Sequence, residues 1–154
     1  KRFKKRRKSS KWLSDVGCIS RQLNETYALV LYDRYSHWVH VEFLPDKEKN
    51  TVLAAFKRFI LLHQRDGRLP HGITEFHSDN GSEFINSDMD AFCDELCIRR
   101  SFSVPRSPEQ NPHAERAWGT LLRKMRIVMH ACGAPESLWP YFMEQAALIH
   151  NICP

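Results

Sequence analysis

Residues 27–33 (YALVLYD) form an unbroken apolar run with β-branched and aromatic side chains. Such a run is typical of a buried strand, which needs a sheet with other elements packed on it. Residues 37–44 (HWVHVEFL) alternate between apolar and polar side chains, as a partner strand does. The three residues between the two runs are few enough for a hairpin. The chain is therefore expected to build a sheet around residues 27–33.

The remaining periodicity predicts a mixed α/β domain with helices packed on the sheet. Further strands are expected over 12–18, 72–78 and 98–102, and helices over 49–65, 86–96, 113–131 and from Pro135 to about 151. Apolar positions at helical spacing are Val52, Ala55, Phe56, Phe59, Ile60 and His63 in the first helix, and Met89, Phe92, Cys93 and Leu96 in the second. Residues 104–112 contain three prolines, so they are predicted to form a loop.

The basic charge is concentrated at the start of the chain. Residues 1–11 contain eight of the 23 Lys and Arg residues and no acid, so the other 15 face all 18 acidic residues in 12–154. A run of this kind is normally solvated. The run is interpreted either as a segment that contacts phosphates or directs nuclear import, or as a basic linker. The folded domain is expected over residues 12–154.

The five cysteines are odd in number and irregularly spaced, which favours free thiols in a reducing compartment. A zinc site at Cys93 and Cys97 would need two further ligands, such as His77 or His113, so buried, structural cysteines are favoured. No apolar run is long enough to span a bilayer. We read the chain, which begins with Lys1, as a piece of a longer polypeptide.

Three acids stand where an acid needs an explanation: Asp15 inside a predicted strand, Asp79 directly after one, and Glu115 in the first turn of a helix. Each has a simpler reading, as an edge residue, an Asx turn and a helix-dipole partner respectively. Taken together, three carboxylates from separate elements are what a Mg²⁺ site for phosphoryl transfer requires. Asp33, which ends a strand before a hairpin, is the alternative first acid. Glu83 is either a fourth acid or a helix N-terminal acid.

The helix over 113–131 has two distinct faces. On one face lie Trp118, Leu121, Leu122, Met125, Val128 and Met129, which are expected to be buried. Another face carries Arg116, Arg123 and Arg126, and Glu115 lies between the two. This arrangement suits a ligand that reaches into a site bordered by nucleic-acid phosphates, although solvated arginines on an ordinary amphipathic helix give the same pattern.

Two segments resemble the conserved blocks of retroviral and retrotransposon integrases. Residues 76–84 (FHSDNGSEF) resemble their Ser-Asp-Asn-Gly-x-Glu-Phe block, and residues 104–121 (VPRSPEQNPHAERAWGTL) the block around their catalytic glutamate. The 35 residues between Asp79 and Glu115 match the D,D-35-E spacing. Residues 135–154 look most like the copia-type branch. The chain departs from the family at Pro112, where Gly is usual, and after Asp15 and Arg116.

The resemblance implies an RNase H-like fold, with a mixed five-stranded sheet flanked by helices. It implies Asp15, Asp79 and Glu115 as catalytic and metal-binding residues, with two Mg²⁺ or Mn²⁺ ions. It also implies 3′-end processing and strand transfer of element DNA, a homo-oligomer, and work in the nucleus after a cytoplasmic particle stage. DNA contacts are expected at Arg116, Arg123, Arg126, Asn80, Gln110, Asn111, Lys4, Lys5, Arg6 and Arg7. The alternatives are a nuclease that does not join DNA and a non-catalytic binding module derived from an integrase.

Overall fold

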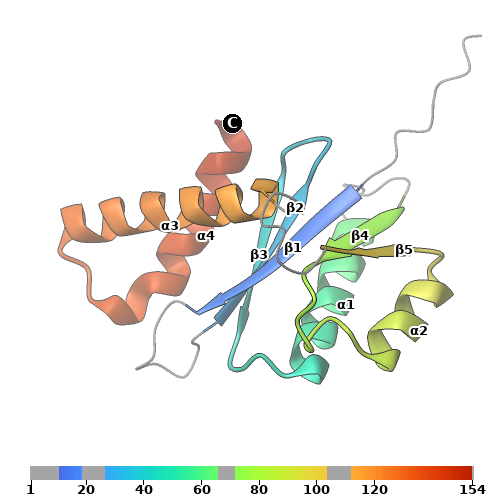
Figure 1. The fold of residues 1–154 in the computed structure, drawn as a ribbon. Helices are drawn as coiled ribbons and strands as arrows, with labels where there is room; N and C mark the ends of the chain where they lie inside the picture. Colours follow the sequence, from blue (N-terminus) through green and yellow to red (C-terminus); the bar gives the residue numbers. More distant parts are fainter. Residues whose placement is uncertain (1–10, 19–26, 66–71, 104–111, 154) are drawn as a thin grey trace, which may run out of the picture.

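A computed structural model of the chain describes residues 11–18, 27–65, 72–103 and 112–153 (Figure 1). Five strands form one sheet in the order β3-β2-β1-β4-β5. They are β1 (Lys11–Cys18), β2 (Tyr27–Asp33), β3 (Val39–Leu44), β4 (Glu75–Ser78) and β5 (Arg99–Phe102). β2 pairs antiparallel with β1 and with β3, whereas β4 pairs parallel with β1 and with β5. The predicted mixed five-stranded sheet is confirmed.

Helices cover the sheet on two sides (Figure 1). One core cluster joins the sheet to α1 (Lys49–Arg65) and α2 (Ser87–Glu95). The other joins it to α3 (Pro112–Cys132) and α4 (Trp139–Ile152), which follows a short 3-10 turn, η2 (Glu136–Leu138). β2 contributes alternate residues to the two clusters, and this explains why its sequence is apolar without interruption.

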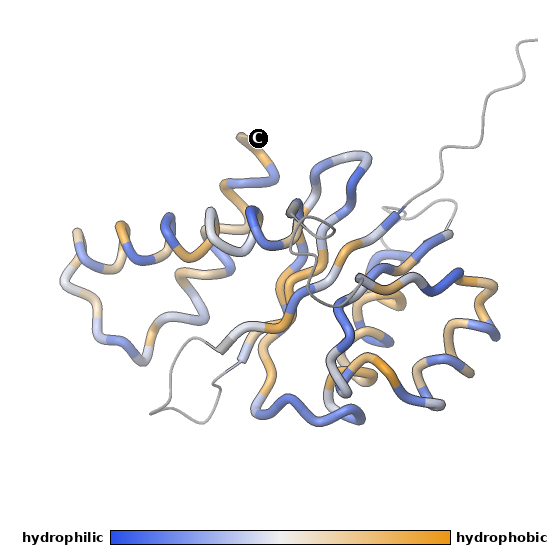
Figure 2. Tube along the Cα trace, in the orientation of Figure 1, coloured by the Kyte–Doolittle hydropathy of each residue, from blue (hydrophilic) through white to orange (hydrophobic). Residues whose placement is uncertain are grey.

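The predicted apolar face of α1 is confirmed, because all six of its members are buried. Figure 2 shows hydrophobic residues along the middle of the central strands, while the helices alternate between hydrophobic and hydrophilic positions. Leu96 and Val128, predicted to be apolar contact positions, are instead 37% and 41% exposed. Leu96 is the C-cap of α2, so it lies beyond the turns that pack on the sheet. Within the described residues, no helix is both long and apolar enough to cross a membrane.

Three strands begin later than their sequence pattern predicts, and a residue with positive φ precedes each of them. These are His37 before β3, Gly72 before β4 and Cys97 before β5, with φ of 61°, 67° and 55°. A left-handed residue interrupts extended backbone, so at His37 and Gly72 the apolar pattern extends into the preceding turn without forming sheet. Cys97 lies just before the predicted strand 98–102, so it does not explain why β5 starts one residue later.

Two helix ends are set by local chemistry. The side chain of Asn86 accepts a hydrogen bond from the backbone N–H of Met89 at 2.9 Å, so Asn86 is the N-cap of α2 and not its first residue. Pro112, predicted to belong to the loop, is the first residue of α3. A proline is well suited to that position, because its missing N–H would have no partner in the first turn.

A close contact between Gly17 and Trp118 joins β1 to α3. A Cβ atom added at Gly17 would lie 2.0 Å from Cζ2 of the Trp118 ring. The ring therefore occupies the place that any other side chain at position 17 would need. A glycine within a strand often marks such a close approach, and here it lets α3 lie directly on the sheet.

Gly17→Ala is expected to lower the free energy of unfolding by about 1–3 kcal/mol, because the new methyl group must displace the indole ring. Urea denaturation would measure this loss. Gly119→Ala on the same helix is the control: no atom lies within 4 Å of its added Cβ, so it should raise stability by roughly 0.5–1 kcal/mol. Equal stability of Gly17→Ala and the wild type would contradict the contact.

Candidate active site

Asp15 and Asp79 come together through the register of two neighbouring strands. β1 and β4 run parallel, with Leu13 opposite His77. Two residues further along each chain are Asp15 and Asp79, so the same offset places the two acids level with each other. β4 ends at Ser78, and Asp79 is the first residue of the turn that follows. The strand end thus leaves its carboxylate at the edge of the sheet.

Glu115 reaches the same region from the helical layer. Ala114 and Ala117 are buried in the cluster that also contains Leu13 of β1. Trp118, three residues after Glu115, lies against Gly17, and Gly17 shares a strand face with Asp15 because side chains alternate along a strand. Residues three apart on a helix are neighbours on its surface. The contact at Gly17 therefore brings the first turn of α3 toward Asp15.

The electrostatics of Asp15 show that the three acids interact. Burial raises the pKa of the Asp15 carboxyl, and the charges of Asp79 and Glu115 raise it further. The backbone N–H of Val16 and the ammonium of Lys47 act in the opposite direction, with smaller effect. Three carboxylates thus share a site in which the positive charge is too small to balance them.

This donor set fits a divalent cation. Mg²⁺ prefers carboxylate oxygens and keeps several waters, so it needs only a few protein ligands. A cation would also relieve the repulsion that raises the pKa of Asp15. Among the described residues, however, no three His, Cys, Asp or Glu side chains are close enough together to hold an ion. The acids are therefore neighbours whose side chains would have to converge further on a bound ion.

Asp33 has a different role from Asp15. Its carboxylate accepts hydrogen bonds from the backbone N–H of Tyr35 at 3.3 Å and from the N–H and hydroxyl of Ser36 at 3.1 and 2.6 Å. These contacts form the turn between β2 and β3. Asp33 pairs with Trp12, near the start of β1 and three residues before Asp15, whose own partner on β2 is Val30. The geometry favours Asp15 as the acid that accompanies Asp79 and Glu115.

The turn after β4 also has local hydrogen bonds. Asp79 Oδ1 accepts from the N–H of Gly81 at 3.2 Å, so the Asx turn considered from the sequence is present alongside the proximity to Asp15. Asn80 Nδ2 donates to the carbonyl of Ser103 at 2.6 Å. The Glu83 carboxylate lies against Gly81, where an added Cβ would be 2.4 Å from Oε2. Glu83 precedes the N-cap of α2, so it is not in the first turn of that helix.

The remaining predicted contact residues divide into two groups. Arg116, Arg123 and Arg126 are exposed on α3. Outside the described residues lie Gln110, Asn111, Lys4, Lys5, Arg6 and Arg7.

Sequence reasoning missed the positioning roles of Gly17 and His77. The signal for Gly17 was a glycine inside a predicted strand. His77 is buried, and burial followed by the charge of Lys11 lowers its pKa. Its Nδ1 and Nε2 contact the hydroxyls of Ser101 and Ser103 at 2.9 and 3.2 Å. No spacing in the sequence predicts these contacts, because they join residues that are far apart along the chain.

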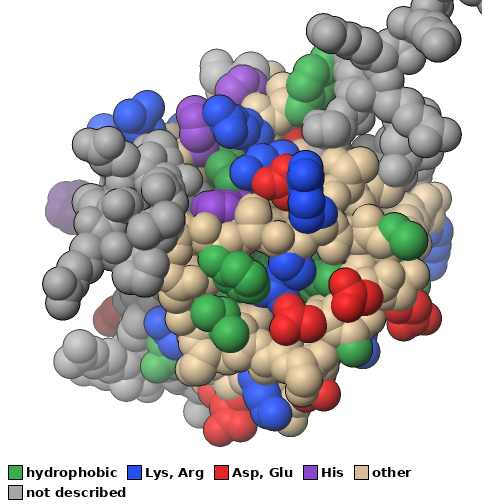
Figure 3. Space-filling view, turned by 45° about the vertical axis from the view of Figure 1, so that its right-hand side comes forward, with side chains coloured by type: hydrophobic (Ala, Val, Ile, Leu, Met, Phe, Trp, Pro, Cys, Tyr) green, Lys and Arg blue, Asp and Glu red, His purple; other side chains and the backbone are tan. Residues whose placement is uncertain are grey.

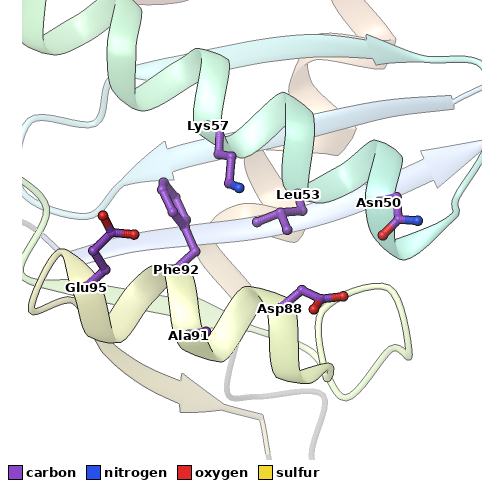
Figure 4. Close-up of a pocket in the computed structure, with 7 residues that line it drawn as sticks. All are labelled: Asn50, Leu53, Lys57, Asp88, Ala91, Phe92 and Glu95. Carbon is purple, nitrogen blue, oxygen red and sulfur yellow. The ribbon is translucent and has the colours of Figure 1, made fainter.

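Two other features are separate from the three acids. A cavity of about 390 Å³ lies between α1 and α2, lined by Asn50, Leu53, Lys57, Asp88, Ala91, Phe92 and Glu95 (Figure 4). These helices pack in the cluster that does not contain α3, so the cavity is away from Glu115. Cys93 is buried, and burial raises the pKa of its thiol to about 11, which makes it a poor nucleophile.

In metal-free protein, Asp15→Asn is expected to raise the melting temperature at pH 7. The folded-state pKa of Asp15 lies above 3.8, so the stability linked to its protonation is present below 3.8 and is lost as the pH rises through the folded-state pKa. The advantage of Asn should therefore be largest near neutral pH and disappear in acid.

Thermal unfolding between pH 3 and 7 would measure this difference. Asp33→Ala is the comparison, expected to lose about 1–3 kcal/mol at neutral pH because it leaves the turn donors without their acceptor. A lower melting temperature of Asp15→Asn than of the wild type at pH 7 would contradict the like-charge site.

Comparison with known proteins identifies the family of this chain. The sequence model of the family described as Integrase core domain matches residues 5–108, which include Asp15 and Asp79. A retrovirus-related Pol polyprotein from transposon TNT 1-94 of Nicotiana tabacum is 30% identical over 118 residues, 76% of this chain. One from transposon RE1 of Arabidopsis thaliana is 26% identical over 131 residues, 85% of this chain. The chain spans only 8% of the length of each of these curated relatives.

Solved integrase structures share the fold. An integrase chain in a simian T-cell lymphotropic virus intasome bound to PP2A regulatory subunit B56 gamma has a TM-score of 0.74 at 16% identity, over 90% of this chain and 47% of that one. The HTLV-2 integrase catalytic core domain in complex with magnesium gives 0.70 at 18% identity, over 90% and 82%. The BIV integrase catalytic core gives 0.69 at 21%, over 92% and 83%. The fold is therefore the RNase H-like fold of integrase catalytic cores.

The family match extends over more than half of the chain, and the architecture is that of solved integrase cores. The chain belongs to the integrase core domain family and is related to the integrases of retroviruses and retrotransposons.

Proposed function

We propose that this domain is the catalytic part of a polynucleotidyl transferase, which trims the 3′ ends of element DNA and joins them to target DNA. The main support is that burial and then the charges of Asp79 and Glu115 raise the pKa of Asp15, so the two other acids act on its carboxyl. The acids come from β1, from the turn after β4 and from α3, so the tertiary fold brings them together. Acids that are evenly solvated on a protein surface would not raise the pKa of one another in this way.

Each acid has a distinct place in the proposed reaction. Asp15 presents its carboxylate from β1, Asp79 from the turn after β4, and Glu115 from the first turn of α3. A phosphodiester lying over the strand ends would have acids on two sides, with the proposed cations between the like charges. Water attacks it in the first step and a DNA 3′-hydroxyl in the second. In both steps a phosphorus–oxygen bond forms and another breaks, and the departing 3′-oxygen takes up a proton.

Two Mg²⁺ or Mn²⁺ ions, held by Asp15, Asp79 and Glu115, would supply Lewis acidity for the attacking and leaving oxygens. The HTLV-2 core, which has the same fold, was solved in complex with magnesium. The chain's own part is to hold these carboxylates on a strand, on the turn that follows the neighbouring strand and on a helix.

DNA binding is proposed for the exposed face of α3 and the basic segment of residues 1–11. Arg116, Arg123 and Arg126 form no ion pair with any described acid. Several other described basic groups are paired with acids: Glu75, for example, binds both Lys11 and Arg99, at 2.6 and 3.2 Å. Figure 3 shows acidic side chains among the Lys and Arg side chains on one such side of the molecule. The α3 arginines are therefore proposed as phosphate contacts. The other proposed contacts are Lys4, Lys5, Arg6 and Arg7 in the basic segment, and Asn80, Gln110 and Asn111, which are close to Asp79 or Glu115 in the sequence.

Assembly and location follow from the same proposal. Joining two DNA ends requires more than one active site, so the working form is proposed to be a homo-oligomer. The eight basic residues in 1–11 suit nuclear import. The proposed location is the nucleus, after a cytoplasmic particle stage.

Asp79→Asn and Glu115→Gln, each made in the full-length protein, are expected to reduce Mg²⁺-dependent strand transfer by at least about a hundredfold, because each removes a charged ligand. Asp33→Asn is the matched control and should stay active, since Asp33 serves the β2–β3 turn. The assay separates cleaved from joined DNA on a gel. Cleavage without joining would support a nuclease instead, and full activity of Glu115→Gln would exclude the proposed site.

Arg123→Ala and Arg126→Ala should weaken DNA binding and reduce the dependence of log K on log salt by about 1 for each phosphate that the variant no longer binds. Fluorescence anisotropy across a salt series measures the slope. Arg58→Ala is the control, because Arg58 is on α1 and binds Glu42 at 3.2 Å. If all three variants changed the slope equally, α3 would not be the DNA-binding face.

A further inference from the structure

Ser103 is bound to the three residues that surround Asp79 in the sequence. Its backbone N–H donates to the carbonyl of Ser78 at 3.0 Å, and its carbonyl accepts from Asn80 Nδ2 at 2.6 Å. Its hydroxyl contacts His77 Nε2 at 3.2 Å. All the polar groups of this one residue are therefore used to hold the strand end and turn that carry Asp79.

The hydrogen bonds around His77 determine the direction of its contact with Ser103. The Ser101 hydroxyl donates to Glu75 Oε1 at 3.0 Å, so toward His77 Nδ1, at 2.9 Å, it can only accept. In a neutral imidazole that carries its proton on Nδ1, Nε2 is an acceptor. The Ser103 hydroxyl must then donate to Nε2. In this series of hydrogen bonds, Ser103 donates to His77, His77 donates to Ser101 and Ser101 donates to Glu75. The series links the end of β5 to β4.

The turn at Asp79 depends on these contacts because it has little support from β1. The pairing of β1 with β4 ends at Leu13 opposite His77, and the pairing of β4 with β5 ends at Ser78 opposite Phe102. Beyond those positions, the backbone around Asp79 is joined to the end of β5 through Ser103. Ser103 also immediately precedes residues 104–111, which lead to α3 and Glu115.

We propose that Ser103 is a positioning residue of the site: its contacts with His77, Ser78 and Asn80 keep the Asp79 carboxylate beside Asp15. The inference rests on the proposed function, in which these acids bind the metal. Ser103 itself touches neither metal nor DNA in this proposal. Asn80 acquires a second role, because one of its amide hydrogens is used to hold the carbonyl of Ser103.

The test is the binding of Mn²⁺ to the whole chain, measured by calorimetry. Ser103→Ala removes the hydroxyl but keeps both backbone contacts, and we expect a loss of affinity on the order of tenfold, as for other residues that orient metal ligands. Ser103→Thr keeps the hydroxyl and should restore affinity to within about twofold of the wild type. Asp79→Asn removes a proposed metal-binding carboxylate, so it gives the calorimetric signal for Mn²⁺ that remains when the site is damaged.

Ser101→Ala is the matched control, since it removes the hydroxyl on the other side of His77. The His77 ring can then donate from Nε2 to Ser103, so this variant should keep the wild-type affinity. In thermal unfolding without metal, Ser101→Ala and Ser103→Ala should have melting temperatures lowered by similar amounts. A loss of affinity confined to Ser103→Ala would thus reflect positioning and not stability.

Two results would overturn the inference, and they differ in what else they overturn. If the wild type binds Mn²⁺, Asp79→Asn does not, and Ser103→Ala binds as the wild type does, Ser103 has no positioning role but the proposed metal site stands. If the wild type binds no Mn²⁺, both the metal site and the role of Ser103 are wrong.

Discussion

In the centre of the sheet, β1 pairs in parallel with β4, with Leu13 opposite His77, and the position of Asp15 relative to Asp79 depends on this pairing. The same offset brings Asp15 level with Asp79, although 63 residues separate them in the sequence. A shift of one residue would turn the side chain of Asp15 to the other face of the sheet. The register is held by the buried side chains of β1, which pack into both core clusters.

The helix α3, which carries Glu115, is positioned against the sheet by a packing contact between a glycine and an aromatic ring. Trp118 lies where the side chain of residue 17 would be, so α3 approaches β1 more closely than a larger residue would allow. This approach places the first turn of α3, with Glu115, near Asp15. The same packing makes Asp15 half-buried, and that burial is the largest cause of its raised pKa. Close packing and an unfavourable concentration of charge are therefore linked, as is common at functional sites.

Much of the fold could be predicted because its local signals agree. The spacing of apolar residues predicted the bounds of β2 and α1 correctly. It failed at the starts of β3 and β4, because His37 and Gly72 adopt positive φ, which apolar periodicity does not detect, and it placed the start of β5 one residue too early. It also did not separate Asp15 from Asp33, since both are acids on strands. The difference is that Asp33 has three hydrogen-bond donors in its own hairpin, whereas Asp15 has two acids beside it.

Residue types and their spacing were enough to predict the element order and the exposed arginines of α3, because these features are local. The spacing along the chain also singled out Asp79 and Glu115, whose role in the site stays a prediction. Only tertiary contacts decided which acid accompanies them, how closely α3 lies on β1, and which residues hold the Asp79 turn. His77 and Ser103 are 26 positions apart, one on β4 and the other just beyond β5, so no local pattern joins them. Contacts of this kind arise only when strands pair and the polar groups at their ends need partners.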